Sequence, residues 1–194
     1  METIRPIGDR VLVRRDEAEA ETEGGIFVPA TVRNPPQRGT VVAVGEGVYT
    51  ESGDLIKLQA EPGNSLLFGA HCGNEVEFNH ETLLMLTARE MLAVVDGDEV
   101  RPVGDRVLVR RDKPKDQTDG GLFLPETAQK PPQTGVVVAH GEGIYTESGV
   151  LLTLPVAAGN RVLFGDGVGS EIEVKGEALI MLGIRDIYGT VAPE

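Results

Sequence analysis

The stretch GDRVLVRRD fills Gly8–Asp16, and it returns unchanged at Gly104–Asp112, a spacing of 96 residues. Two later stretches recur in the same register: GGIFVP (Gly24–Pro29) as GGLFLP (Gly120–Pro125), and GEGVYTESG (Gly45–Gly53) as GEGIYTESG (Gly141–Gly149). The register never slips, so the chain is a tandem duplication. Any function proposed for it has to work in duplicate.

The repeat divides the 194 residues into two predicted domains, residues 1–96 and 97–194. Each is near the lower end of the usual domain size and can bury a modest core. The 25 Gly and 12 Pro residues punctuate short Val, Leu and Ile runs, a pattern typical of all-β proteins with many turns. We therefore expect two small all-β domains.

The net charge of -13 disfavours binding to nucleic acid or to an anionic membrane surface, because phosphate groups repel such a chain. A single cysteine, Cys72, cannot form an internal disulfide and is compatible with a reducing compartment. No apolar run approaches the roughly 18 residues of a membrane span, and the first residues do not read as a targeting segment. We expect a cytoplasmic protein, with a removed organellar presequence left open.

β-branched and other apolar residues in short runs predict the strands of repeat one. The predicted strands are 4–13, 39–44, 65–68, 75–78, 82–86 and 91–95, with a hairpin over 45–58 whose tip is 51–54. Together they predict a small barrel or sandwich. Only four polar or glycine residues, 96–99, separate the last strand from the first strand of repeat two, so we expect these two strands to pair as a hairpin.

An acidic stretch, DEAEAETEGG at residues 16–25, holds two alanines as its only apolar residues. Such a segment buries too little surface to order itself, which predicts a mobile loop. The apolar triplet Ile26–Val28 follows it directly, and Leu122–Leu124 holds the same place in repeat two. The alternative, that the triplets are buried strand residues, conflicts with the composition of the residues before them.

The order of these motifs resembles the signature of the GroES family, the chaperonin-ten co-chaperonins. In repeat one the signature runs from Ile4-Arg5-Pro6-Ile7 through Asp9-Arg10, three apolar residues and Arg14 to the Gly24-Gly25 pair and its apolar triplet. Repeat two gives the same pattern from Val100 to Leu124, and the likeness extends to the segments 83–86 and 179–182. The tandem arrangement looks like the double-domain co-chaperonins of plant plastids.

The resemblance implies two tandem GroES-like small β-barrels with mobile loops and roof hairpins. It also implies a ring-shaped homo-oligomer that caps a GroEL-type chaperonin in its ATP-bound state and serves unfolded client proteins indirectly. The docking role falls on the glycine and apolar triplet of each loop: Gly25, Ile26, Phe27, Val28 and Gly121, Leu122, Phe123, Leu124. By the same resemblance, Tyr49, Glu51, Tyr145 and Glu147 belong to the roof, although they also read as ordinary solvated turn residues.

Metal binding and catalysis find little support in the sequence. His71, Cys72 and His80 could ligate a metal, but Gly167, Val168 and Gly176 replace them in repeat two. No nucleophile elbow, phosphate loop or dinucleotide fingerprint is present. We expect a non-enzyme with no cofactor and no metal. The alternative function is a ring-forming interaction or structural protein that kept the barrel but serves no chaperonin.

Overall fold

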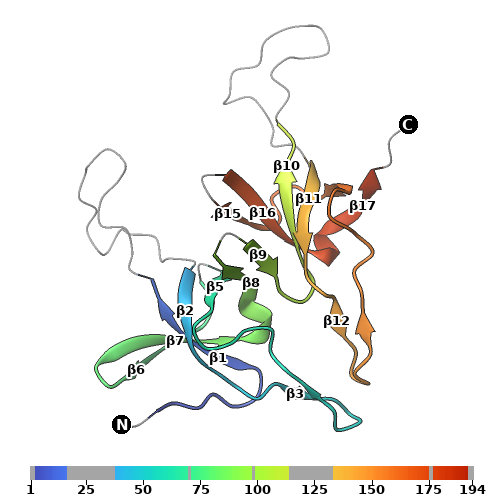
Figure 1. Cartoon of the computed structure of the whole chain (residues 1–194). Coiled ribbons are helices and arrows are strands. Elements are labelled where there is room, and N and C mark those ends of the chain that lie inside the picture. The colour runs from blue at the N-terminus through green and yellow to red at the C-terminus, as the bar shows by residue number, and fades with distance from the viewer. Residues whose placement is uncertain are drawn as a thin grey trace, which may run out of the picture. The chain divides into compact units, whose positions relative to one another are not determined.

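The computed structural model describes residues 3–16, 38–69, 71–97, 99–113, 133–174 and 177–191. These residues form strands joined by turns, with short 3-10 helices at Ala88–Glu90 (η1) and Ile184–Asp186 (η3) (Figure 1). The predicted all-β class is confirmed, and both repeats carry the same succession of strands up to the end of the sheet. Among the described residues, each main sheet has two free edges in its hydrogen-bonded strand order and does not close into a barrel.

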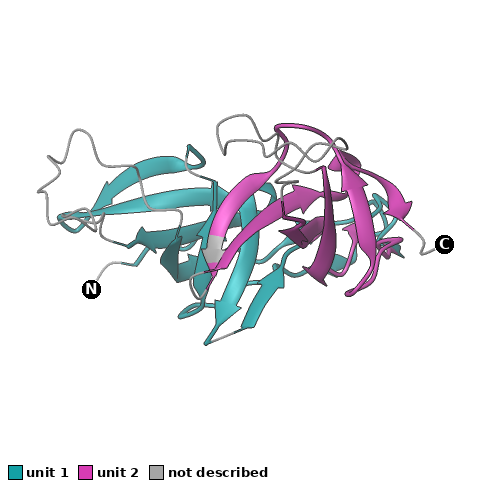
Figure 2. Ribbon diagram, turned by 90° about the horizontal axis from the view of Figure 1, so that it is seen from above, with its two compact units in different colours: residues 1–103, 145–151 teal, residues 104–144, 152–194 magenta. Residues whose placement is uncertain are grey.

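Unit 1 comprises residues 1–103 and 145–151 (Figure 2). Its main sheet has the order β6-β7-β1-β2-β5-β8-β9. The strands are β1 (Arg10–Arg15), β2 (Arg38–Val44), β5 (Ser65–Phe68), β6 (Asn74–Phe78), β7 (Glu81–Thr87), β8 (Met91–Asp96) and β9 (Glu99–Pro102). The strands β3 (Val48–Tyr49) and β4 (Leu55–Ile56) form a separate two-stranded hairpin.

Unit 2 comprises residues 104–144 and 152–194, and its sheet has the order β15-β16-β10-β11-β14-β17. The strands are β10 (Arg106–Arg111), β11 (Thr134–His140), β14 (Arg161–Phe164), β15 (Ser170–Val174), β16 (Glu177–Gly183) and β17 (Ile187–Val191). The second hairpin of repeat two consists of β12 (Ile144–Tyr145) and β13 (Leu151–Leu152), and its residues 145–151 group with unit 1. Each strand of unit 2 therefore repeats a strand of unit 1.

The repeated stretch GDRVLVRRD supplies a central strand of each sheet. Val11 and Val13 are completely buried in the core of unit 1 beside Phe68, and Val107 and Val109 lie equally buried beside Phe164 in unit 2. Burying an apolar side chain of this size contributes about 1.5–3 kcal/mol. The most strictly repeated residues of the chain are thus those that hold each sheet to its core.

The repeated Gly-Glu-Gly motif marks a close approach of two backbones at the base of each hairpin. Gly47 has a φ of 115°, and a Cβ atom there would lie 2.1 Å from the carbonyl oxygen of Ile56. Gly143 has a φ of 127°, and a Cβ atom would lie 2.0 Å from the carbonyl oxygen of Leu152. Only glycine fits this backbone and this spacing.

The predicted pairing across the join of the repeats is confirmed. β8 and β9 are antiparallel neighbours, with Ala93 opposite Pro102 and Asp96 opposite Glu99, and Gly97 lies in the connecting turn with a φ of 57°. The prediction of one strand over residues 4–13 was wrong in its first half, because the strand begins at Arg10. The equivalent residues of repeat two form β9 because they pair with β8, the last strand of repeat one. Among the described residues, 3–7 have no such partner strand.

Candidate functional site

The predicted docking residues, Gly25 with 26–28 and Gly121 with 122–124, lie outside the described residues. The structure describes how the chain enters and leaves the segments that hold them, 17–37 and 114–132. In each unit the segment joins the end of one strand to the start of its antiparallel neighbour, β1 to β2 and β10 to β11. Both segments therefore leave the same end of equivalent strand pairs (Figure 1).

Each segment is closed at its base by a backbone hydrogen bond. The N–H of Asp16 donates to the carbonyl oxygen of Arg38 at 3.0 Å, and the N–H of Asp112 donates to that of Thr134 at 2.9 Å. Because the bond sits at the same repeat position in both units, the two segments begin and end at matching points. The attachment of the predicted docking residues is thus duplicated along with their sequence.

A two-pronged ion pair stands beside each base. The Arg14 guanidinium donates to both carboxylate oxygens of Glu81, with Nη2 3.0 Å from Oε2, and Arg110 repeats this with Glu177. The hydrogen bond from Arg14 lowers the pKa of Glu81, and that from Arg110 lowers the pKa of Glu177. These side chains are exposed, so the pairs align strands without adding much stability.

The predicted roof residues lie on the two hairpins. Tyr49 is 60% exposed and Tyr145 is 41% exposed. Glu51 and Glu147 both belong to unit 1. The N–H of Glu51 donates to the carbonyl oxygen of Glu147 at 3.0 Å, so these two predicted residues are in contact. The tips are also braced internally, because the hydroxyls of Thr50 and Thr146 accept hydrogen bonds from the backbone N–H groups of Asp54 and Val150. A roof role for these residues stays a prediction.

The outer edge of β17 is a feature that the motif reading missed. Among the described residues of unit 2, no strand pairs with this edge, and Leu163, Tyr188 and Val191 are 39%, 72% and 42% exposed. In unit 1 the equivalent strand β8 is covered by β9, and the counterparts Leu67 and Leu92 are only 8% and 7% exposed. The repeat held part of the signal, because the residues of β9 have a sequence counterpart in residues 3–7, which form no strand in the structure.

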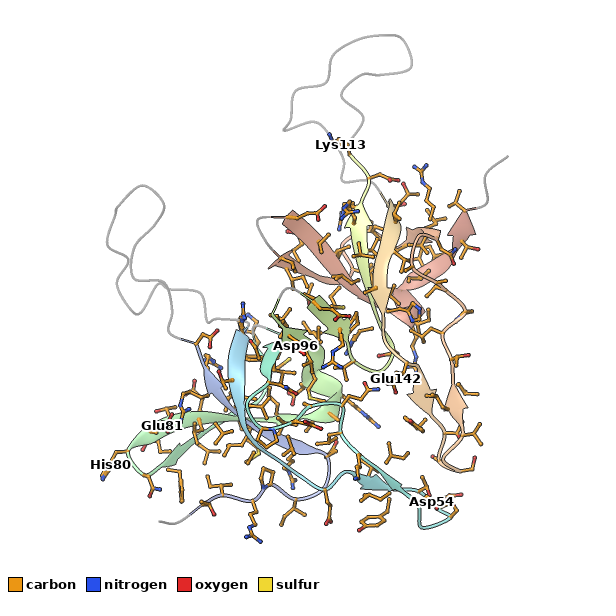
Figure 3. All side chains as sticks on the ribbon, in the orientation of Figure 1. Asp54, His80, Glu81, Asp96, Lys113 and Glu142 are labelled. Atoms are coloured by element: carbon orange, nitrogen blue, oxygen red, sulfur yellow. The ribbon has the colours of Figure 1, made fainter. Side chains whose placement is uncertain are left out.

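The three potential metal ligands lie in two turns of unit 1, with His71 and Cys72 before β6 and His80 after it. Cys72 packs against the core, while His80 sits at the tip of the β6–β7 turn with a φ of 63° (Figure 3). Among the residues that the structure describes, no group of three His, Cys, Asp or Glu side chains is placed to hold a metal. Nor does the described part of the chain contain a helix long and apolar enough to cross a membrane.

The fold defines a class: a duplicated all-β protein in which equivalent strand pairs are joined by equivalent long connections. Residues 3–95 and 99–191 each match the family described as the chaperonin 10 Kd subunit. The chain belongs to this family.

Relatives of two kinds are similar to it. The 20 kDa chloroplastic chaperonin of Arabidopsis thaliana is 36% identical over 98% of this chain and 76% of its own length, and that of Spinacia oleracea is 31% identical over the same shares. The co-chaperonin GroES of Pelobacter propionicus is 45% identical over 93 residues, which cover 48% of this chain and 98% of that protein. The first kind shares the tandem arrangement, and the second corresponds to a single repeat.

Proposed function

We propose that this co-chaperonin caps a GroEL-type chaperonin ring in its ATP-bound state and thereby assists the folding of client proteins. The observation that carries the proposal is the duplicated attachment: two segments, each with an apolar triplet, leave equivalent strand pairs closed by equivalent hydrogen bonds. Docking falls on Ile26, Phe27 and Val28 and on Leu122, Phe123 and Leu124. Gly25 and Gly121 let the backbone turn just before each triplet.

The energetics favour many weak contacts over one strong contact. Burying three apolar side chains contributes about 1.5–3 kcal/mol each, and ordering a disordered segment on binding costs about 2–5 kcal/mol. One segment alone therefore binds weakly. Several segments held on one assembly raise one another's effective concentration, so the cap binds firmly and still releases when its partner changes conformation.

The bare edge of β17 supports a homo-oligomer. The other outer strands of the two sheets carry charge, with Glu75 and Glu77 on β6 and Glu171 on β15, as edges that must avoid pairing usually do. β17 has the sequence IYGTV and carries none. An uncharged, exposed edge is suited to accept a strand from another chain.

The strand that fits this edge is the segment 3–7 of a second copy. Its sequence TIRPI is the counterpart of EVRPV at 99–103, whose strand β9 already pairs with β8 inside the chain. Val103 packs against the core of unit 1, whereas its counterpart Ile7 is 73% exposed. Each chain thus offers one donor segment and one acceptor edge, a head-to-tail joint that generates a ring when the rotation closes.

The hairpins β3–β4 and β12–β13 would form the roof of such a ring. Exposed apolar residues near both tips, Tyr49 and Val48 in one and Tyr145 and Ile144 in the other, support contacts among hairpins in the assembly. Glu51 and Glu147 at the tips keep the rim charged. No catalytic step is part of this proposal, so ATP hydrolysis belongs to the partner ring.

In this proposal the protein is located in the same cellular compartment as the chaperonin that it caps. A cytoplasmic protein stays a prediction, and the chloroplastic names of two relatives support an organelle as the alternative. Neither the fold nor the comparisons favour the alternative function, a ring-forming interaction protein that serves no chaperonin.

Chaperonin capture separates these functions. The protein is mixed with a GroEL-type ring and ATP and passed over a sizing column, beside a Phe27→Ser, Phe123→Ser variant. A matched control, Tyr49→Ser with Tyr145→Ser, also removes two aromatic residues but leaves both triplets intact. Nucleotide-dependent co-elution that only the phenylalanine variant loses is the expected result. No co-elution of the wild type with several such rings would favour the interaction protein.

A further inference from the structure

The bases of the segments 17–37 and 114–132 have matching backbone hydrogen bonds. They differ in the side chains that surround the aspartate at each base, Asp16 or Asp112. In unit 2 the Asp112 carboxylate accepts a hydrogen bond from the Thr134 hydroxyl and another from the Arg161 guanidinium, whose Nη2 lies 2.7 Å from Oδ2. These bonds join the residue after β10 to the first residue of β11 and the first residue of β14. We call Asp112, Thr134 and Arg161 the base clamp.

In unit 1 the same three positions form a different arrangement. Asp16 lies 3.9 Å from the Nε atom of Arg38, beyond hydrogen-bond distance, and Nε instead donates to the Ser65 hydroxyl at 2.8 Å. The Asp16 side chain is 47% exposed, whereas that of Asp112 is 25% exposed. The Asp16 carboxylate therefore keeps only the 3.9 Å ion-pair contact with Arg38, without the two side-chain hydrogen bonds that Asp112 accepts.

The cause is an exchange of two side chains between equivalent positions. Unit 1 has its arginine at the start of β2 (Arg38) and its hydroxyl at the start of β5 (Ser65). Unit 2 has its hydroxyl at the start of β11 (Thr134) and its arginine at the start of β14 (Arg161). Only in the second arrangement do both partners reach the aspartate.

We propose that the base clamp holds the attachment of repeat two's docking segment more firmly than the equivalent residues of repeat one hold theirs, and that it thereby favours docking through repeat two. This rests on the proposed function. A base that opens lengthens the free chain and spreads the directions in which it leaves the sheet, and both effects raise the entropic cost of docking. Because the clamp bonds the residues that flank this segment, it lowers that cost in repeat two. Figure 3 labels Lys113, the residue next to the clamp.

The first test measures the base without any chaperonin. Hydrogen exchange at the backbone N–H of Asp112, which closes the base, should accelerate about two- to fivefold in Asp112→Asn, the range of a partly exposed ion pair. The matched variant Asp16→Asn should change the exchange of the Asp16 N–H much less. Equal effects of the two substitutions, or none, would overturn the clamp.

The second test isolates one docking segment at a time. Phe27→Ser leaves repeat two as the intact docking segment, and Phe123→Ser leaves repeat one. Asp112→Asn should weaken capture by a GroEL-type ring about two- to fivefold in the Phe27→Ser background and should leave the Phe123→Ser background unchanged. Equal weakening in both backgrounds would show a general effect on folding and would overturn the positioning role.

A transplant tests whether the exchange of side chains is sufficient. Arg38→Thr with Ser65→Arg gives repeat one the arrangement of repeat two and should strengthen capture in the Phe123→Ser background. Unchanged capture there, with slower exchange at the Asp16 N–H, would show a clamp that does not act on docking and would overturn the proposal. If the wild type is not captured at all, the proposed function fails with it, and the exchange data still show whether the clamp exists.

Discussion

The strands β8 and β17 hold the same place in the two repeats and differ in what lies beside them. β8 is covered by β9, and its residue Leu92 is buried, whereas among the described residues the outer edge of β17 is bare and its residue Tyr188 is 72% exposed. The sheets beneath the two edges are otherwise alike. The difference teaches that one sequence position can be covered within the chain or left open, and in our proposal the open edge of β17 pairs with residues 3–7 of a second copy.

The largest expected effect comes from charging the bare edge. Tyr188→Lys with Val191→Lys should weaken self-association at least about a hundredfold, or about 2.8 kcal/mol, because two ammonium groups would have to be desolvated at the joint and would face Arg5 of the incoming segment. Analytical ultracentrifugation across a dilution series measures the effect. Glu171→Lys on the edge strand β15 adds the same net charge and should leave the association unchanged. A double variant that associates like the wild type would mean that β17 is not the joint.

A smaller effect is expected at two apolar residues that occupy equivalent positions in the repeats, Val103 and Ile7. Val103→Ala should lower the free energy of unfolding of the dissociated chain by about 1 kcal/mol, because Val103 packs against the core of unit 1. Ile7→Ala should change it by less than about 0.5 kcal/mol, since Ile7 is 73% exposed. Urea unfolding followed by circular dichroism gives both values. The ranking of the two substitutions should reverse when self-association is measured, because Ile7→Ala should weaken self-association more than Val103→Ala does.

The smallest effect depends on pH and on the turn after β7. Burial by itself raises the pKa of Glu90. Hydrogen bonds from the N–H groups of Thr87 and Gly73 and from the Thr87 hydroxyl lower the pKa by more than burial raises it, so the pKa lies below its ordinary value. A carboxyl whose pKa is lowered by folding stabilises the fold above its unfolded pKa, and this stabilisation is lost as the pH falls through the lowered pKa.

Glu90→Gln should therefore cost about 1 kcal/mol near neutral pH, with a difference from the wild type that shrinks in acid. Calorimetric melting over a pH series measures this. In repeat two the counterpart Asp186 accepts a hydrogen bond from the N–H of Gly183, a residue without a hydroxyl, so Asp186→Asn should cost less. Glu77→Gln, at an exposed carboxylate, serves as the control. A Glu90→Gln penalty that persists unchanged into acid would contradict the charge effect.

Much of the fold could be predicted because the deciding residues act locally. Apolar runs such as Ser65–Phe68 form strands wherever they meet a partner, and the glycines of the Gly-Glu-Gly motif fit a backbone that other residues cannot adopt. The pairing of β8 with β9 followed from the short link between them. The same composition led to an error at residues 4–7, where β character is present but the partner strand is not.

The candidate site was harder to predict, because its features depend on contacts between distant positions. The base clamp joins Asp112, Thr134 and Arg161, and no local pattern links an arginine in β14 to an aspartate that follows β10. The bare edge of β17 is likewise a matter of pairing between distant segments, because among the described residues β14 is the strand that lies beside it. The predicted docking triplets lie outside the described residues, and their role stays a prediction.

The turn at Gly97 also fixes an order. In a ring joined head to tail, the covalent link makes the two kinds of repeat alternate without exception, so a difference confined to one repeat reappears at every second position around the circle. Identical single repeats can display no such pattern. A tandem ring therefore has the periodicity of a pair, and a partner ring with an odd number of subunits must meet it out of step at least once in each revolution.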